Sequence, residues 1–340
     1  MKAAVLKEPR HITIEERPLP APGSSEVVIQ VMYVGYCGTD VMVWAGNYRA
    51  RYPVVPGHEF VGKVLSVGSA VEGVRAGDIV APEASYPCGA CAMCSSGLEE
   101  YCRNRVSLGR MRDGAMAEYV VVPAKIAHRV DERIDPRDAQ SLVGVACAVR
   151  AVAKSSIATG TKVAIIGSGH SALLLLQVAR AAGADGIAIL GGSRKSHLAL
   201  ARHLGADLVV GYSDPDTDRL LGGFTRSGFD VVFEASGQPE SLNKAIALVR
   251  PGGVVTVFST YREAVDHMQG QELYYKEITI RGSKSGTGGY EAAIDLLASG
   301  KVQVGPMITH EVTLEEVRRG FELAESRDES VFRVIMRVVT

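Results

Sequence analysis

Hydrophobic and polar positions form a strand-like pattern in the first third of the chain. The segments Met1–Leu6, Glu26–Val34 and Phe60–Val67 are short, rich in valine and isoleucine, and bounded by proline or glycine. Such segments are typical of β-strands. The stretch Leu19–Ser25 is rich in proline and glycine and predicts a turn between strands. We therefore expect a β-rich first part of the chain.

The pattern changes at Asp138–Lys154, a long run rich in alanine and valine that has helical spacing. After it, strand-like and helix-like segments alternate, which predicts a parallel, doubly wound sheet. The expected strands are Lys162–Ile166, Gly186–Leu190, Phe229–Glu234 and Val254–Phe258. The expected helices are Ala172–Ala182, Ser196–Leu204 and Ser241–Val249, and a turn is expected at Pro251-Gly252-Gly253.

The alternation lapses near Gly282. The tail has one more expected helix, Tyr290–Ser299, and one more expected strand, Phe332–Val338, and we predict that it rejoins the first domain. A chain of 340 residues is about twice a typical domain, so two domains are expected. The fold class is α/β, with one β-rich domain and one doubly wound domain.

Four of the six cysteines lie in one short run, at Cys88, Cys91, Cys94 and Cys102. Four thiolates this close can form a tetrahedral Zn²⁺ shell, and Gly89 and Gly97 permit the tight turns that wrapping around an ion requires. The alternative is a pair of disulfides, but adjacent C-x-x-C pairs make strained loops and nothing else in the sequence is typical of a secreted protein. We predict a structural zinc site with no open position for chemistry.

Composition and charge narrow the range of partners. The chain is 46% hydrophobic and 22% charged, which is ordinary for a globular protein, and its formal net charge is -1. No basic face is implied, so we expect no nucleic-acid partner. The apolar stretches fall short of a membrane span, and thiolate ligands fit a reducing, cytoplasmic compartment.

A glycine-rich turn follows the expected strand Lys162–Ile166. The turn has the pattern G-x-G-x-x-A and leads into a helix, as in dinucleotide-binding folds. The alternative is an ordinary tight β–α turn, and His170 either touches the pyrophosphate or caps the helix. We expect the cofactor phosphates at the helix N-terminus, on Gly167, Ser168, Gly169, His170 and Ala172.

The next strand indicates which dinucleotide is bound. An NAD site places an acid at the end of this strand, but here the strand is followed by Gly191, Gly192, Ser193, Arg194 and Lys195. These residues leave room for a 2′-phosphate and can neutralise it, although they also fit the solvated start of a helix. We expect NADP(H) to be preferred over NAD(H).

A second metal site is indicated by Cys37, in G-Y-C-G-T-D, and by His58 and Glu59, in V-V-P-G-H-E-F. A thiolate, an imidazole and a carboxylate can all bind Zn²⁺, and three protein ligands plus water make a catalytic site. Taken alone, Cys37 is equally well explained as a buried core cysteine, and the pair His58–Glu59 as a surface pair.

Taken in order along the chain, these motifs resemble the zinc-dependent medium-chain alcohol dehydrogenases, on the polyol- or sorbitol-dehydrogenase-like branch. The motifs are C-G-T-D, G-H-E, C-x-x-C-x-x-C-x7-C and G-x-G-x-x-A, joined by the segment Phe229–Gly237 and the turn at Pro251. The resemblance implies a GroES-like catalytic domain from residues 1–150 and 284–340, with a Rossmann domain inserted at residues 151–283.

The resemblance also implies roles for single residues. Cys37, His58 and Glu59 match the catalytic zinc ligands, and Thr39 matches the hydroxyl that passes the substrate proton. Asp40 matches a supporting residue, and Arg333 matches a late pyrophosphate contact. The implied reaction is hydride transfer between NADP(H) and a small, secondary alcohol or polyol and its ketone or aldehyde. Two zinc ions per chain and a homodimer or homotetramer are expected.

Three positions depart from the family pattern. Met42 stands where many members have a histidine as proton exit, and Gly38 stands where some have an arginine for the phosphates. Leu142 and Val143 lie where a further ligand is often found and cannot bind metal, but Cys147 lies one helical turn later and can substitute. Aromatic and sulfur-containing side chains near the motifs either line a pocket or belong to the core: Tyr36, Trp44, Tyr48, Tyr52 and Met111.

Two other functions remain as alternatives. The first is a zinc-free quinone or enoyl reductase of the same superfamily, and the second is a zinc-containing scaffold that binds a dinucleotide without turnover. Zinc content separates the first alternative from the leading hypothesis, and turnover separates the second.

Overall fold

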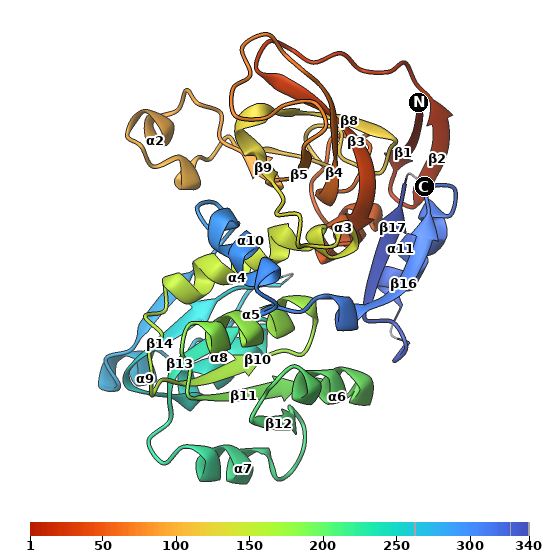
Figure 1. Cartoon of the computed structure of the whole chain (residues 1–340). Helices are drawn as coiled ribbons and strands as arrows, with labels where there is room; N and C mark the ends of the chain where they lie inside the picture. The colour runs from red at the N-terminus through yellow and green to blue at the C-terminus, as the bar shows by residue number, and fades with distance from the viewer. Residues whose placement is uncertain (262, 327, 339–340) are drawn as a thin grey trace. The chain divides into compact units, whose positions relative to one another are not determined.

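The computed structural model describes residues 1–261, 263–326 and 328–338 (Figure 1). The chain forms two compact units: Met1–Val143 with Ile308–Thr340, called unit 1 here, and Gly144–Met307, called unit 2. The boundaries expected from the sequence lay at residues 150/151 and 283/284. The difference at the second boundary has a packing reason, because Gly286 and Gly289 approach Ala146 of unit 2 so closely that a side chain would not fit.

Unit 1 is built on an antiparallel sheet whose longest strand, β3 (Glu26–Gly35), pairs with β4 (Glu59–Val67), β8 (Tyr119–Pro123) and β17 (Arg333–Arg337). The pairing of β3 with β17 brings the end of the chain back to its first third. The remaining strands of this unit are β1 (Lys2–Glu8), β2 (His11–Glu16), β5 (Ile79–Pro82), β6 (Ser85–Tyr86), β7 (Val106–Ser107), β9 (Ala127–Arg129) and β16 (Ile308–Thr313). Its helices are α1 (Gly38–Trp44), α2 (Ala92–Ser95), α3 (Pro136–Ala139) and α11 (Val317–Glu325).

The core of unit 1 contains two of the aromatic residues that the sequence left as pocket or core candidates. Trp44 stacks on Phe321 with ring centroids 5.0 Å apart, and Tyr36 meets the same ring edge-on, also at 5.0 Å. Tyr36 and Trp44 are buried in the cluster of strand residues, whereas Tyr48 and Tyr52 pack against it from outside. Tyr36 and Trp44 therefore hold α1 and α11 on the sheet.

Unit 2 is a parallel sheet with the strand order β12-β11-β10-β13-β14-β15. Its strands are β10 (Lys162–Ile166), β11 (Gly186–Gly191), β12 (Leu208–Gly211), β13 (Phe229–Glu234), β14 (Val249–Val257) and β15 (Thr279–Gly282). Its helices are α4 (Leu142–Ala153, which begins just before the unit), α5 (His170–Ala181), α6 (Lys195–His203), α7 (Thr217–Phe224), α8 (Pro239–Leu248), α9 (Gly270–Tyr275) and α10 (Tyr290–Ala298). The doubly wound α/β sheet expected from the sequence is confirmed.

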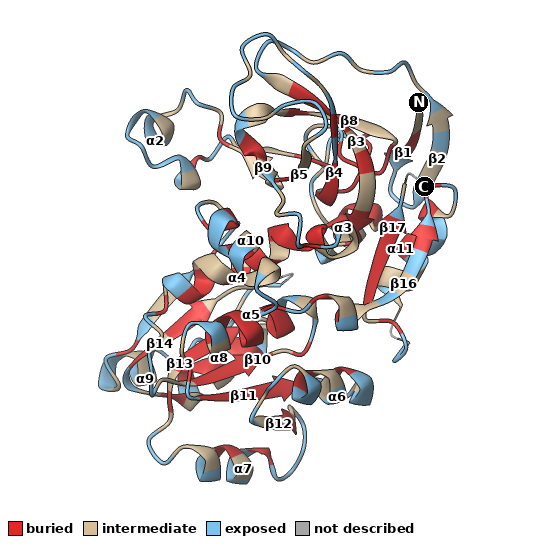
Figure 2. Ribbon diagram, in the orientation of Figure 1, coloured by how far each residue is buried: buried red, intermediate tan, exposed pale blue. Residues whose placement is uncertain are grey.

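Burial explains why these strands form without alternating polar residues. Figure 2 shows β10, β11 and β13 almost wholly buried, while the helices of unit 2 keep exposed faces. Parallel strands are covered on both faces, so a continuous apolar run is the expected pattern. Strand order reverses between β10 and β13, and the carboxyl ends of strands at such a point are where ligands bind in open α/β sheets.

Two local predictions differ from the structure. The long helix expected at Asp138–Lys154 is two helices, because the backbone makes a turn at Gln140–Ser141, where the Ser141 N–H donates to the Asp138 carbonyl at 2.9 Å between the end of α3 and the start of α4. The turn expected at Pro251–Gly253 lies within β14, where the pairing with β13 shifts register. Among the described helices, none combines the length and the apolar character that a membrane crossing requires.

Candidate functional site

Three candidate ligands, Cys37, His58 and Glu59, lie together where β3 ends and the neighbouring strand β4 begins. Cys37 is the N-cap of α1, two residues after β3, and Glu59 is the first residue of β4 and lies opposite Gly35 of β3. One ligand atom from each of the three residues lies within 4.8 Å of the others. A sulfur, a nitrogen and an oxygen donor at this spacing fit a zinc ion with one position left open.

Asp40 orients the metal-ligating candidates. Its carboxylate is 2% exposed; Oδ1 lies 3.0 Å from Nδ1 of His58, and Oδ2 accepts a hydrogen bond from the Cys37 N–H at 3.2 Å. Oδ1 also accepts from the Gly57 N–H at 3.2 Å. A histidine bound in this way through one ring nitrogen presents the other, Nε2, to a metal. The supporting role expected for Asp40 thus has a specific geometry.

Electrostatics link these groups to one another. Burial lowers the pKa of His58, but the charges of Asp40 and Cys37 outweigh it and raise that pKa well above its ordinary value. Burial and the neighbouring Glu59 carboxylate raise the pKa of the Cys37 thiol. A metal ion binds the thiolate and the neutral imidazole, so its binding to these groups releases protons.

Arg333 lies beside Glu59, in the interior of unit 1. Its side chain is buried: Nη2 contacts the Glu59 carboxylate and donates to Oε1 of Gln140 at 3.0 Å, and Nη1 donates to the Tyr36 carbonyl at 3.0 Å. The resemblance implied a pyrophosphate contact, which stays a prediction, whereas the structure shows a guanidinium engaged with the metal-ligand candidate. Gln140 was not singled out in the sequence, because no motif surrounds it.

The four clustered cysteines have the geometry of a closed metal shell. Their Sγ atoms are separated by 3.6 Å (Cys91–Cys94 and Cys88–Cys102), 3.7 Å (Cys91–Cys102) and 4.0 Å (Cys88–Cys94). A tetrahedron with Zn–S bonds of about 2.3 Å has edges of about 3.8 Å, so the sulfurs match it closely. All four are free thiols, and Figure 1 shows the segment around α2 standing out from the strands of unit 1.

The backbone conformation and the thiol pKa values of this segment are compatible with metal binding. Gly89 and Gly97 have φ of 75° and 72°, in the left-handed region that favours glycine. A hydrogen bond involving the Cys94 backbone lowers the pKa of Cys91 to about 6, whereas burial and the hydrogen bond with Cys91 raise the pKa of Cys94 to about 11. A thiolate is therefore available near neutral pH, as zinc ligation requires.

The dinucleotide turn lies at the point where strand order reverses. Gly167 follows β10 with a φ of 127°, and a Cβ there would lie 2.9 Å from the Ala235 carbonyl oxygen. Gly169 is the N-cap of α5, a Cβ on it would meet only open space, and Ala172 is fully buried. His170 is the first residue of α5, and Ser168 is buried. The free N–H groups of α5 are thus available to an anion.

The loop after β11 is accessible as the NADP(H) prediction requires. Ser193 and Lys195 are exposed, Arg194 is half-buried as the N-cap of α6, and a Cβ on Gly192 would meet nothing within 4 Å. The Tyr212 N–H donates to the Gly191 carbonyl at 2.7 Å, which places the end of β12 beside this loop.

Two family models match the chain: an alcohol dehydrogenase GroES-like domain over residues 23–132 and a zinc-binding dehydrogenase domain over residues 172–299. Sorbitol dehydrogenase from Halalkalibacterium halodurans is 33% identical over 93% of both chains, and L-threonine 3-dehydrogenase from Bacillus velezensis is 35% identical over 95% of both. A structure from Sinorhizobium meliloti, described as a zinc-binding dehydrogenase bound to NADP, superposes with a TM-score of 0.91 at 30% identity and covers 99% of this chain and 98% of that one.

The chain belongs to the zinc-dependent medium-chain alcohol dehydrogenase family. As a family member it is an oxidoreductase, and the GroES-like and Rossmann folds expected from the sequence are confirmed.

Four further positions bear on the chemistry of this family member. Thr39 lies on α1, two residues after Cys37, and is partly accessible, whereas a side chain at Gly38 would meet open space. Met42 lies one turn later on the same helix. Cys147 lies on α4 in unit 2 and is not in the described cluster that contains Cys37, so its part as a ligand stays a prediction.

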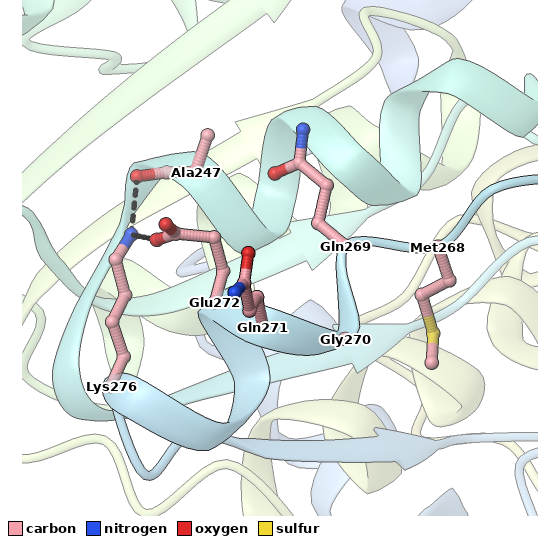
Figure 3. Close-up of a pocket in the computed structure, with 7 residues that line it drawn as sticks. All are labelled: Ala247, Met268, Gln269, Gly270, Gln271, Glu272 and Lys276. Carbon is pink, nitrogen blue, oxygen red and sulfur yellow. Dashed lines mark hydrogen bonds and ion pairs between the residues drawn. The ribbon is translucent and has the colours of Figure 1, made fainter.

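A hollow of about 690 Å³ lies in unit 2, between the end of α8 and the start of α9 (Figure 3). Its one cationic side chain is already engaged: Lys276 Nζ donates to the Ala247 carbonyl at 3.0 Å and pairs with Glu272 at 3.2 Å. The residues that line it include no cysteine or histidine, so we assign it no part in the dehydrogenase chemistry.

Proposed function

We propose that this family member is a zinc-dependent oxidoreductase that prefers NADP(H) and interconverts a secondary alcohol or polyol with the corresponding ketone or aldehyde. The observation that carries the proposal is the convergence of Cys37, His58 and Glu59 to within 4.8 Å. The name of the sorbitol dehydrogenase relative supports a polyol as substrate.

The proposal assigns one zinc ion to Cys37, His58 and Glu59 and a second to Cys88, Cys91, Cys94 and Cys102. The first set leaves a coordination position for the substrate oxygen, and Cys147 remains a further candidate ligand. The second set is complete with four thiolates, so its role is structural.

Zinc supplies polarisation of the substrate oxygen, and the nicotinamide supplies or accepts the hydride. The chain's own residues do the rest. Asp40 holds the His58 ring through Nδ1 and the Cys37 backbone through its N–H. Thr39, on the first turn of α1, would accept the proton of the substrate hydroxyl on its Oγ1 during oxidation while its own hydroxyl proton passes on to water, and the two transfers would run in reverse during reduction.

The cofactor part of the proposal rests on unit 2. Gly167, Ser168, Gly169, His170 and Ala172 form the turn that receives the pyrophosphate, and Ser193, Arg194 and Lys195 receive a 2′-phosphate. The absence of an acid at the end of β11 supports NADP(H), because a carboxylate there would repel that phosphate. The S. meliloti structure, described as bound to NADP, supports the same choice.

The experiment that tests the proposal combines metal analysis with cofactor titration. We expect two zinc ions per chain, tighter binding of NADPH than of NADH by fluorescence, and NADPH-dependent reduction of ketoses or secondary ketones. Cys37→Ser should remove one zinc ion and the activity but leave NADPH binding intact, and the same measurements on Cys147→Ser decide whether that thiol is a further ligand. An active enzyme after Cys37→Ser contradicts the catalytic metal assignment, and preference for NADH contradicts the role of the Ser193–Lys195 loop.

A further inference from the structure

An acidic residue is fully buried at the carboxyl end of the central strand of unit 2. Glu234 ends β13, pairs with Ile166 of β10 on one side and Val257 of β14 on the other, and has 0% of its surface exposed. β13 is one of the two strands between which strand order reverses. Burying a carboxylate is costly unless hydrogen bonds compensate it, so its presence in an otherwise apolar strand requires a reason.

One oxygen of Glu234 organises the loop that follows β13. Oε1 accepts hydrogen bonds from the Ser236 N–H at 2.8 Å, the Ser236 hydroxyl at 2.6 Å and the Gly237 N–H at 3.0 Å. The Ser236 hydroxyl also lies 2.8 Å from that of Ser241, on the first turn of α8. Residues 235–237, called the β13 loop here, are thus folded around a single buried carboxylate oxygen.

The β13 loop packs against the dinucleotide turn. The Ala235 N–H donates to the Ile166 carbonyl at 2.9 Å, directly before Gly167. A Cβ on Gly167 would lie 2.9 Å from the Ala235 carbonyl oxygen and 3.3 Å from the Ser236 nitrogen. Displacement of the β13 loop therefore changes the packing that fixes Gly167, the first residue of the dinucleotide turn. The Gly167 N–H itself donates to the Leu190 carbonyl at 2.8 Å, and the free N–H groups that follow, at the N-terminus of α5, are the ones available to the phosphates.

The segment after β14 also packs against Glu234 and the β13 loop. Within the described residues, neither Oε2 of Glu234 nor the buried Tyr261 hydroxyl has a hydrogen-bond partner of good geometry. Burial, and after it the Glu234 carboxylate, raise the pKa of Tyr261. The Glu234 carbonyl also accepts from the Phe258 N–H at 2.9 Å, and Gly237 approaches the Thr260 carbonyl. Glu234 therefore contacts the ends of β10, β13 and β14 together.

We propose that Glu234 is a positioning residue for dinucleotide binding: its buried carboxylate fixes the β13 loop in the conformation that holds the Gly167 turn ready for the pyrophosphate. The inference rests on the proposed binding of a dinucleotide at that turn. Glu234 itself is covered by the loop and does not touch the cofactor, so it acts on affinity through the backbone of residues 235–237 and Gly167.

The same strand provides a matched control at its other end. Asp230 accepts from the Lys162 N–H at 2.7 Å and pairs with Arg250 at 2.6 Å, so it too joins an acid on β13 to the backbone of β10. It does so at the amino ends of the strands, away from the phosphate-binding turn. Substitution of either acid is expected to lower stability, but only substitution of Glu234 is expected to change dinucleotide affinity in the folded protein.

The test is the Kd for NADPH and NADH of the full chain, measured by fluorescence for Glu234→Ala, Glu234→Gln, Asp230→Ala and Asp230→Asn, with Tm from thermal unfolding. Glu234→Ala is expected to raise Kd on the order of tenfold, as the loss of several buried hydrogen bonds implies. Glu234→Gln, whose amide oxygen still accepts from the loop, should raise it about threefold. Both Asp230 variants should lower Tm and keep the wild-type Kd. In steady-state turnover, Glu234→Gln should raise the KM for the dinucleotide and keep kcat at saturation.

Each outcome decides one question. A folded Glu234→Ala protein with the wild-type Kd overturns the inference and leaves the proposed dinucleotide binding in place. If Glu234→Ala does not fold, Glu234→Gln decides, since a Kd equal to that of the wild type overturns the inference in the same way. An Asp230 variant that weakens binding as much as its Glu234 counterpart shows a general effect of stability and overturns it as well. Wild-type protein that binds neither NADPH nor NADH overturns both proposals together.

Discussion

At the scale of single residues, the metal-ligating candidates depend on neighbours that bind no metal themselves. Asp40 contacts the His58 ring and two backbone N–H groups from different segments, and is buried while doing so. Arg333 contacts Glu59 in a similar way from the last strand of unit 1. The donors are thus held by hydrogen bonds that orient them before any substrate arrives.

Asp40→Asn should weaken zinc binding at the Cys37 site by about 10- to 100-fold, because loss of the charge removes the support for the His58 ring. Zinc affinity measured by competition with a chelator checks this, with one tightly held zinc ion remaining at the cysteine cluster. Asp113→Asn is the control, since Asp113 accepts from the Val55 N–H at 2.9 Å outside the site. Equal zinc retention by wild type and Asp40→Asn is the contrary result.

Residue-level reasoning from the sequence found the donors but not their arrangement. Cys37, His58 and Glu59 stood out because each is a ligand type in a short motif. Gln140 and the Glu59–Arg333 contact did not, because residues 59 and 333 are brought together by strand pairing, and no local pattern records such a contact.

At the scale of elements, short segments hold their geometry through specific caps and turns. The segment from Cys88 to Cys102 contains only the short helix α2 and a single turn of 3₁₀-helix, and most of its residues are exposed or half-buried. It has few apolar contacts with which to hold itself together. A metal shell is the physical means by which such a segment becomes rigid.

Cys94→Ser should remove one zinc ion per chain and lower the Tm, because metal binding at this segment contributes to folding. Metal analysis and thermal unfolding measure both effects. Cys147→Ser replaces a thiol outside the cluster. It should leave the zinc content of this segment unchanged and lower the Tm less than Cys94→Ser does. An unchanged Tm for Cys94→Ser contradicts a structural metal.

Asp230 makes the stability of unit 2 depend on pH. Burial alone would raise the pKa of Asp230, but hydrogen bonds from the Lys162 N–H and from Arg250 lower it overall. A group with a lowered pKa in the folded state stabilises the fold fully above its unfolded pKa of about 3.9, and this stabilisation is lost as pH falls through the folded value.

The difference in Tm between wild type and Asp230→Asn should therefore be constant from about pH 5 to pH 8 and shrink below about pH 4. Thermal unfolding across this range measures it. The control is Asp185→Asn, which removes the exposed carboxylate that pairs with Lys162 Nζ. Because solvent screens that pair, the difference in Tm from the wild type should be smaller at every pH than for Asp230→Asn. A difference that does not change with pH contradicts the lowered pKa.

At the scale of the whole molecule, the two units have different origins along the chain. Unit 2 is one continuous segment, whereas unit 1 is completed by β16, α11 and β17 from the end of the chain. The core of unit 1 shows this directly, since Phe321 of α11 packs on Tyr36 and Trp44. Truncation after unit 2 would thus remove part of the core of unit 1.

The homodimer or homotetramer expected from the family resemblance is a prediction for the whole chain. With a chain mass of 36.1 kDa, light scattering should give about 72 kDa for two chains (2 × 36.1) or about 144 kDa for four (4 × 36.1). A mass near that of a single chain at micromolar concentration contradicts the prediction.

By itself, the sequence determined those features that depend on neighbours along the chain. β10 and β13 match their predicted bounds, since continuous apolar runs between polar turns specify buried parallel strands. The cysteine run and the glycine turn were recognisable because the spacing of their residues already specifies a local shape.

Only the tertiary structure decided what depends on distant contacts. It divided the expected helix at Asp138–Lys154, placed residues 284–307 in unit 2, and buried Arg333 against Glu59. It also showed that the Glu234 carboxylate is buried and hydrogen-bonded to the β13 loop, which the position of this residue in an apolar strand did not indicate. The physical reason is that hydrogen bonds and packing between segments far apart in sequence are fixed by how strands pair, and a local pattern of residue types contains no record of that pairing.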